Sequence, residues 1–357
     1  MQYINNITEA IGHTPLLKLN NIGKDLDANI FVKLEYLNPS GSYKDRMALS
    51  MINAAERGET WNGKKLSAGG TVVEASAGNT APAVAMVCAS KGYKARLFLY
   101  RYQMNQPNNC RMLITQAYGP EVAVSSEPEK YLTEEQIKKF SEIEPDLVHV
   151  LSAKLDCQKF EDEEENCVWV DQIYNKYNYL GQLEMGREIA QQLDGKIDAV
   201  GCSVSSGASL YGLCMGLKEC GVKPALTFGV VPKGSETYYS LQKDECDRDE
   251  FCVGTTSSDI AKIIGLDKWY TTSSINEILY NEGYPDKFFR ITSEEAREMA
   301  NRLCQEEGIF CGMSSGANVA VALKIAERLG PGKNIVTTIV DRRDRYLSET
   351  PNEKYVV

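Results

Sequence analysis

One lysine stands where its amine could take part in covalent chemistry. Lys44 follows a turn-forming run at 38–43 that contains proline and glycine, and it precedes apolar residues at helical spacing, among them Met47, Met51 and Ile52. A partly desolvated amine at the mouth of a cleft can act as a nucleophile or a base. An ordinary surface lysine at a helix start fits this motif equally well. Lys44 is therefore a catalytic candidate whose role depends on what the rest of the chain places beside it.

Three turns rich in small residues each join a predicted strand to a predicted helix. Residues 76–80 could bind a carboxylate, because free backbone N–H groups and the helix dipole favour an anion there. Residues 205–209 suit a phosphate, since small side chains admit close backbone approach and hydroxyls add donors. Residues 312–317 could present a hydroxyl to a ligand. Any one of these could be a plain tight turn, and the chain has neither a P-loop nor a GxGxxG motif.

The lysine and the three turns together form a more specific set. Pyridoxal phosphate chemistry on an amino acid requires a lysine that forms a Schiff base, a phosphate cradle, a carboxylate cradle and a hydroxyl for a ring nitrogen. The combination predicts pyridoxal 5′-phosphate as the cofactor and an amino acid as the substrate.

The elements that would position these groups alternate between short β-rich runs and longer helical patterns. The predicted strands lie at 29–34, 70–74, 95–100, 197–204, 226–231 and 334–341. The predicted helices lie at 83–91, 292–306 and 317–329. Thr292 and Glu295 stand at capping-box spacing, which marks the start of the second helix. This alternation predicts an α/β fold of largely parallel sheets flanked by helices.

Two sets of alternating elements predict two domains, which suits a length of 357 residues. We expect a smaller, substrate-binding domain at 47–165 and a larger, cofactor-binding domain made of 1–46 plus 166–357. The acidic run at 161–166 marks the boundary, and its charge is that of a solvated surface loop.

Composition restricts the class of protein. Apolar residues make up 43% and charged residues 25% of the chain, as in soluble globular proteins. A net charge of −10 argues against nucleic acid or an anionic membrane as the main partner. The eleven cysteines include no CxxC pair and there are two histidines, so we expect no metal site, no disulfide scaffold and a cytoplasmic location. We also expect no signal peptide and no membrane span.

With these features in place, the chain resembles the fold type II pyridoxal-phosphate enzymes, and among them the cysteine synthase and cystathionine β-synthase group. The resemblance runs from 12–16 to 341–348 and covers nearly the whole chain. The family's lysine motif resembles 38–46, its substrate loop 78–80 and its ring-nitrogen motif 308–317. The implied fold is the two-domain, tryptophan synthase β-like architecture, with a largely parallel sheet in each domain.

The resemblance implies a role for each matched residue. Lys44 would hold the cofactor as a Schiff base and then move the α-proton of the substrate. Asn79 would hydrogen-bond the 3′-oxygen of the ring, and Ser314 would face the ring nitrogen. The phosphate would be held by Ser205, Ser206, Gly207, Ala208 and Ser209. The substrate carboxylate would be bound by Ser76, Ala77, Gly78, Thr80 and Gln172.

The resemblance also implies the reaction. A serine beside the ring nitrogen does not hold that nitrogen protonated as a carboxylate would, which favours loss of a β-substituent over transamination. The expected activity is β-replacement on an activated L-serine or L-cysteine through an aminoacrylate intermediate, with a sulfur or other small nucleophile adding, as in cysteine biosynthesis. This transferase or lyase would be a homodimer. Its N-terminal residues would pack on the larger domain, and its mobile smaller domain would close on the substrate.

Three other functions stay open. The first is β-elimination, as in a cysteine desulfhydrase or a hydroxyamino-acid dehydratase. The second is a cofactor-free scaffold homologue, against which the intact Lys44, Asn79 and Ser314 argue. The third is a nucleotide-binding oxidoreductase, which rests on α/β alternation alone and lacks a dinucleotide motif. The residues indicate neither the leaving group nor the incoming nucleophile.

Several positions depart from the family's pattern. Ala77 stands where serine is usual and Ala81 where glycine is usual. A lost hydroxyl donor costs about 0.5–1.5 kcal/mol if nothing replaces it. The segments 101–109 and 251–259 also differ, which leaves the second substrate open. Residues 341–344 are more charged than the family's turn and are expected to form a surface loop.

Overall fold

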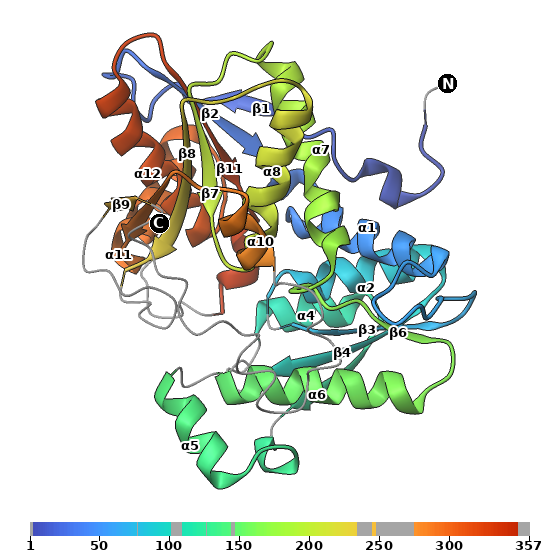
Figure 1. Cartoon of the computed structure of the whole chain (residues 1–357). Coiled ribbons are helices and arrows are strands. Elements are labelled where there is room, and N and C mark those ends of the chain that lie inside the picture. The colour runs from blue at the N-terminus through green and yellow to red at the C-terminus, as the bar shows by residue number, and fades with distance from the viewer. Residues whose placement is uncertain are drawn as a thin grey trace.

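The computed structural model has two lobes, each built on a sheet of mostly parallel strands (Figure 1). It describes residues 3–76, 78–100, 109–125, 127–143, 147–233, 245–247 and 275–348. The predicted α/β class is confirmed, and each predicted strand and helix is present. Within the described part of the chain, no helix combines the length and apolarity needed to cross a bilayer.

The larger lobe holds a sheet of seven described strands in the order β1-β2-β11-β7-β8-β10-β9. These strands are β1 (Leu16–Lys18), β2 (Asn29–Leu34), β7 (Ala199–Ser203), β8 (Leu226–Pro232), β9 (Glu245–Asp247), β10 (Lys287–Ile291) and β11 (Asn334–Ile339). Only the edge strands β1 and β9 pair antiparallel with their neighbours among these seven. The central strands therefore bring their carboxyl ends, and the loops that follow, to one edge of the sheet.

The smaller lobe holds a parallel sheet in the order β5-β4-β3-β6. Its strands are β3 (Thr71–Ala75), β4 (Lys94–Tyr100), β5 (Glu121–Ser125) and β6 (Cys167–Trp169). Because β6 pairs with β3, this sheet extends past residue 165, where the sequence led us to place the domain boundary.

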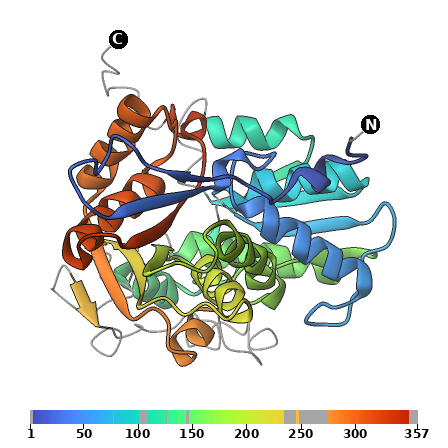
Figure 2. The same cartoon turned by 90° about the horizontal axis from the view of Figure 1, so that it is seen from above.

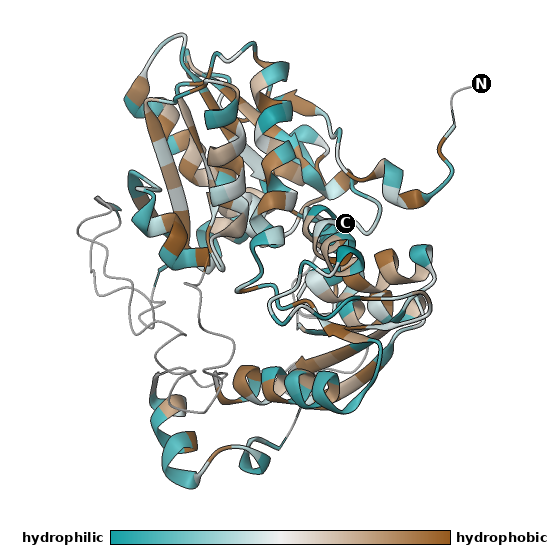
Figure 3. Ribbon diagram, turned by 45° about the vertical axis from the view of Figure 1, so that its right-hand side comes forward, coloured by the Kyte–Doolittle hydropathy of each residue, from teal (hydrophilic) through white to brown (hydrophobic). Residues whose placement is uncertain are grey.

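Helices cover both sheets, and Figure 3 shows apolar residues along the strands, whereas α5 is mostly hydrophilic. The α-helices are α1 (Lys44–Arg57), α2 (Thr80–Lys91), α4 (Cys110–Ala117), α5 (Glu134–Ile143), α6 (Leu147–Glu163), α7 (Lys176–Gln192), α8 (Ala208–Glu219), α10 (Ile275–Asn281), α11 (Ser293–Glu307) and α12 (Met313–Leu329). The 3-10 turns are η1 (Ile7–Ala10), η2 (Glu35–Leu37), η3 (Pro128–Lys130) and η6 (Arg343–Tyr346). The capping box expected at the start of α11 is formed by Thr292 and Glu295.

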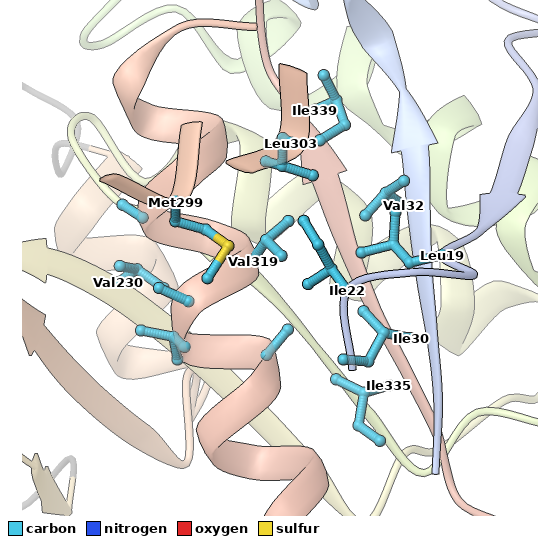
Figure 4. Packing of buried hydrophobic residues seen from close by; sticks show 14 of the residues in the cluster. Leu19, Ile22, Ile30, Val32, Val230, Met299, Leu303, Val319, Ile335 and Ile339 are labelled. Carbon is cyan, nitrogen blue, oxygen red and sulfur yellow. The ribbon is translucent and has the colours of Figure 1, made fainter. Parts of the chain in front are cut away.

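The core of the larger lobe lies between its sheet and the pair α11 and α12 (Figure 4). Leu303 of α11 and Val319 of α12 face Ile335 and Ile339 of β11, and all four are fully buried. Burial of such side chains removes apolar surface from water, which is the main favourable term in folding. This packing fixes the strand ends on which the site is built.

The start of the chain contacts both lobes, so it packs on the larger lobe, as the sequence predicts, and also reaches the smaller one. β1 belongs to the larger sheet, but the Asn6 amide donates to the Ser90 carbonyl of α2 at 3.2 Å, and the Ser90 hydroxyl donates back to Asn6 at 2.5 Å. Figure 2 shows this segment reaching across to the smaller lobe. The polar cap that Asn6 forms on η1 leaves its amide free to make this contact.

Truncation of Leu303 tests the importance of this core. Leu303→Ala removes a fully buried side chain, so we expect it to lower the free energy of unfolding by about 2–5 kcal/mol. Leu180 lies on α7 with 37% of its surface exposed, and Leu180→Ala is the matched control, with an expected loss below about 1 kcal/mol. Urea-induced unfolding of both variants checks this. Equal losses would show that Leu303 is not part of a tightly packed core.

Candidate active site

The turn before Lys44 is held against the end of β11. Ser42 forms an isolated β-bridge with Asp341, which stands two residues after the end of β11. Gly41 has a φ of 90°, and a Cβ at that position would lie 2.5 Å from a guanidinium nitrogen of Arg345. Both the left-handed backbone and the lack of space require glycine here. The turn therefore places Lys44 at the carboxyl edge of the larger sheet.

Lys44 is the first residue of α1 and is half-buried. Its Nζ lies 4.8 Å from the centroid of the Tyr43 ring, which is a cation–π distance. Burial raises the pKa of the Cys202 thiol to about 12, and the charge of Lys44 opposes that rise. Cys202 belongs to β7, so the Lys44 amine lies near this strand. The predicted reactive amine thus lies near the strand that leads into the predicted phosphate loop.

The predicted carboxylate loop and Gln172 are in contact. The Thr80 hydroxyl donates to the Gln172 side-chain oxygen at 2.6 Å, and the Gln172 amide donates to the last carbonyl of β3 at 3.2 Å. The Ser76 hydroxyl accepts the N–H of Gly78 at 3.1 Å. Ala77, predicted for the same loop, lies outside the described residues. The loop ends at the first turn of α2, whose dipole favours an anion.

A buried ion cluster lies beneath this loop, and the sequence analysis missed it. The Glu74 carboxylate accepts the N–H groups of Ala75 at 2.9 Å and Gln172 at 3.1 Å. The Lys154 amine, from α6, lies 3.2 Å from an Asp171 carboxylate oxygen. Burial, and then the negative charge of Asp171, raise the pKa of Glu74 to about 8. At neutral pH Glu74 therefore carries a proton, and the cluster is neutral because Lys154 balances Asp171.

Asn79 is bound at both ends of its carboxamide. Its Nδ2 donates to Asp341 at 2.5 Å, and its Oδ1 accepts from Arg345 at 2.5 Å. Tyr346 also donates its hydroxyl to Asp341. Burial raises the pKa of the Asp341 carboxyl, and Arg345 opposes that rise. The residue predicted to contact the cofactor ring is thus oriented by the chain's C-terminal segment.

The expectation of a surface loop at 341–344 is wrong for two of its residues. Asp341 is fully buried, and Arg343 is 8% exposed and donates to the Cys311 carbonyl at 3.1 Å. Asp341 is bound both by distant Asn79 and by nearby Tyr346. Arg342, with a side chain that is 52% exposed, matches the expectation.

The predicted phosphate loop joins β7 to α8. Gly207, at the N-cap of α8, has a φ of 83°, and a Cβ there would lie 2.6 Å from the Asn276 side-chain oxygen. The Asn276 amide donates to the Ser205 carbonyl at 2.7 Å, which ties the loop to α10. The loop 205–209 therefore presents small residues at a helix N-terminus, as an anion site requires.

Ser314 lies in the first turn of α12, beside the same strand ends. It lines a cavity of about 140 Å³ together with Ser203, the last residue of β7. A Cβ on Gly312 would lie 2.4 Å from Asp341 Oδ1, so the start of α12 and the end of β11 approach closely. Asp341 thus contacts the lysine turn, the start of α2 and the start of α12.

Titration of Glu74 can be measured through stability. Its raised pKa means that the folded protein holds the proton more tightly, so the stabilisation is complete below pH 4.5 and is lost as pH rises to about 8. We expect Glu74→Gln to gain stability relative to the unmodified protein across that window. Unfolding free energies at a series of pH values check this, with exposed Glu142→Gln as the control that should follow the unmodified protein. If the unfolding free energies of Glu74→Gln and the unmodified protein differ by the same amount at every pH, the raised pKa of Glu74 is contradicted.

Comparison with known proteins agrees with this geometry. The family model described as "Pyridoxal-phosphate dependent enzyme" matches residues 7–341. A cysteine synthase of Staphylococcus aureus is 34% identical over 348 residues, which span 97% of this chain and 96% of that protein. Cysteine synthase 1 of Emericella nidulans is 32% identical, over 96% of this chain and 84% of that protein.

Comparison with a solved structure also indicates this family. The crystal structure of a hydrogen sulfide-producing enzyme (Fn1220) from Fusobacterium nucleatum superposes with a TM-score of 0.72 and 26% identity, over 97% of this chain and 99% of that one. The family match over nearly the whole chain, together with relatives above 30% identity, establishes the relationship. The chain belongs to the pyridoxal-phosphate dependent enzymes of fold type II and, among them, to the cysteine synthase family.

Proposed function

We propose that this protein catalyses β-replacement on an activated L-serine or L-cysteine and adds a small sulfur nucleophile, as cysteine synthases do. The placement of Lys44 carries the proposal: this residue begins α1 at the carboxyl edge of the larger sheet, and its amine lies near β7, the strand that leads into the predicted phosphate loop. The similarity to cysteine synthases over nearly the full length of both chains supports the choice of reaction.

The described residues fit pyridoxal phosphate. Lys44 would hold its aldehyde, and the loop 205–209 would hold its phosphate, because this loop presents small residues and backbone N–H groups at the start of α8. Asn79 would contact the 3′-oxygen, and Ser314 would contact the ring nitrogen. When bound, the cofactor supplies an electron-accepting ring for charge from the α-carbon.

In this assignment, Ser314 would determine how strongly the cofactor ring accepts charge. A neutral hydroxyl accepts or donates a hydrogen bond but does not stabilise a protonated ring nitrogen as a carboxylate would. A weaker electron sink favours prompt loss of a β-substituent. Lys44 would take the α-proton, because it is the amine that is freed when a substrate amine replaces it.

The substrate carboxylate would be bound by the loop of Ser76, Ala77, Gly78 and Thr80, with Gln172. The contact of Thr80 with Gln172 supports this assignment. The neutral state of the cluster around Glu74 also supports it, because an ionised pair of acids beneath the loop would repel a carboxylate.

We also propose that the chain works as a cytoplasmic homodimer in cysteine biosynthesis, and that its smaller lobe is a mobile, substrate-binding domain that closes on the amino acid. Helix α1 supports this division, since its apolar residues pack with those of α2 and β3 rather than with the larger sheet. Sheet membership of β6 moves the proposed boundary from 165 to the end of that strand.

Replacement of Lys44 tests the chemistry directly. We expect Lys44→Ala to lower turnover by at least the order of 10³-fold, because it removes both the covalent anchor and the proton carrier. Borohydride reduction of the loaded protein followed by peptide mapping should place the pyridoxyl group on Lys44. The control is Lys18→Ala, which replaces an exposed lysine on β1 and should keep both the normal turnover and the pyridoxyl adduct on Lys44. An adduct on another lysine would contradict the assignment.

β-Elimination is the second candidate, because the superposed Fn1220 enzyme is a hydrogen sulfide producer. Incubation of O-acetylserine, O-phosphoserine, serine or cysteine with and without sulfide or a thiol separates the two reactions. For replacement we expect the product amino acid by mass spectrometry, and pyruvate release that falls when the nucleophile is added. Pyruvate release that is indifferent to the nucleophile would instead establish elimination.

A further inference from the structure

Arg345 connects three parts of the site through a single buried guanidinium. It is 1% exposed, and it donates to the Asn79 side-chain oxygen at 2.5 Å and to the Ser40 carbonyl at 2.7 Å. Ser40 belongs to the turn before Lys44, whereas Asn79 caps α2 in the smaller lobe. The arginine itself comes from η6, after the last strand of the larger sheet.

These contacts leave the Asn79 carboxamide one orientation. Its oxygen accepts from Arg345, and its nitrogen donates to Asp341, so a flipped amide would set donor against donor and acceptor against acceptor. The amide nitrogen carries two N–H groups, and Asp341 takes one of them. The second N–H is available for a ligand on the same side of the amide.

Acidic side chains around the Arg345 guanidinium help to hold it in one position. The negative groups around the guanidinium include Asp45, Asp341 and Asp344. Burial raises the pKa of Asp45 to about 7, while its hydrogen bonds from Ser40 and the charge of Arg345 oppose the rise. A planar guanidinium with several donors in fixed directions can satisfy two acceptors at once, which an ammonium group does poorly.

We propose that Arg345 is a positioning residue that orients Asn79 toward the 3′-oxygen of the cofactor and sets its distance from the lysine turn. The proposal rests on the assignment of Asn79 to that oxygen in the proposed function. A donor at the 3′-oxygen stabilises its ionised form, which absorbs visible light. Loss of the correct amide orientation should therefore change both the spectrum and the affinity of the bound cofactor.

The test compares Arg345→Lys with Arg343→Lys. Both arginines lie in η6, are buried and donate to a backbone carbonyl, but the structure gives Arg343 no hydrogen bond to Asn79. Pyridoxal phosphate is titrated into each cofactor-stripped protein, the absorption spectrum of each loaded protein is recorded, and melting temperatures report stability. We expect Arg345→Lys to weaken cofactor affinity by about tenfold, the scale at which supporting contacts act. Its visible band should move toward the ultraviolet.

Arg343→Lys should lower the melting temperature comparably while its spectrum and affinity stay those of the unmodified protein. Asn79→Ala is the third arm, and it should shift the spectrum in the same direction as Arg345→Lys. If the spectrum shifts in Asn79→Ala but not in Arg345→Lys, the role of Arg345 is overturned while the assignment of Asn79 stands. An unshifted Asn79→Ala would overturn the assignment of Asn79, and the proposal with it. If Arg345→Lys does not fold, Arg345→Met takes its place, because it keeps a long side chain but removes every donor to Asn79. We expect the visible band of that variant to shift as well, and an unshifted band would overturn the proposal.

Discussion

A buried cluster of charges at the start of α1 is the constraint on which the site depends. Arg46 donates to Glu35 of η2 and to Glu188 of α7, each at 2.8 Å, and Lys33 of β2 lies 2.6 Å from Glu188. Burial opposes ionisation of Glu188, but Arg46 and Lys33 outweigh it and lower its pKa to about 2. Because Arg46 stands two residues after Lys44, these bonds fix the turn of helix that carries the amine.

The same helix is bound to the two lobes by different forces. Met47 and Ile52 of α1 are buried with Val72 of β3, so apolar packing attaches the helix to the smaller lobe. The ion cluster attaches it to the larger lobe. Removing one partner from a buried ion pair leaves an uncompensated charge and costs about 3–5 kcal/mol. Any shift of α1 that separates these charges would have a similar cost, so the cluster holds α1 in one position on the larger lobe. Lys44 is consequently held at the junction between the lobes.

Local sequence patterns predicted the strands, helix caps and turns, which depend on neighbouring residues. They did not predict contacts between residues that are far apart in the chain. Strand β2, the capping box at Thr292 and the loop at 205–209 are all visible as short-range periodicity or turn chemistry. The grouping of Gln172 with the loop that contains Thr80 was predicted only through family resemblance, and the hydrogen bond between the two was not predicted. The Asn79 amide that binds Asp341 lies 262 residues earlier in the chain, so the charge of Asp341 alone suggested solvent exposure. A glutamate inside the apolar strand β3 was the sole local sign of the cluster around Glu74.

These buried acids also explain how an acidic chain can bind two anionic groups. The chain carries a net charge of −10, and a phosphate and a carboxylate must both approach the site. Two of the buried acids beside the site have a compensating cation, since Lys154 balances Asp171 and Arg345 lies beside Asp341, whereas burial raises the pKa of Glu74 to about 8. The local field at the N-termini of α2 and α8 is therefore not cancelled by the acids behind them. In the proposed site, helix ends and backbone N–H groups would supply the attraction, while the surface charge is screened by salt over roughly 10 Å.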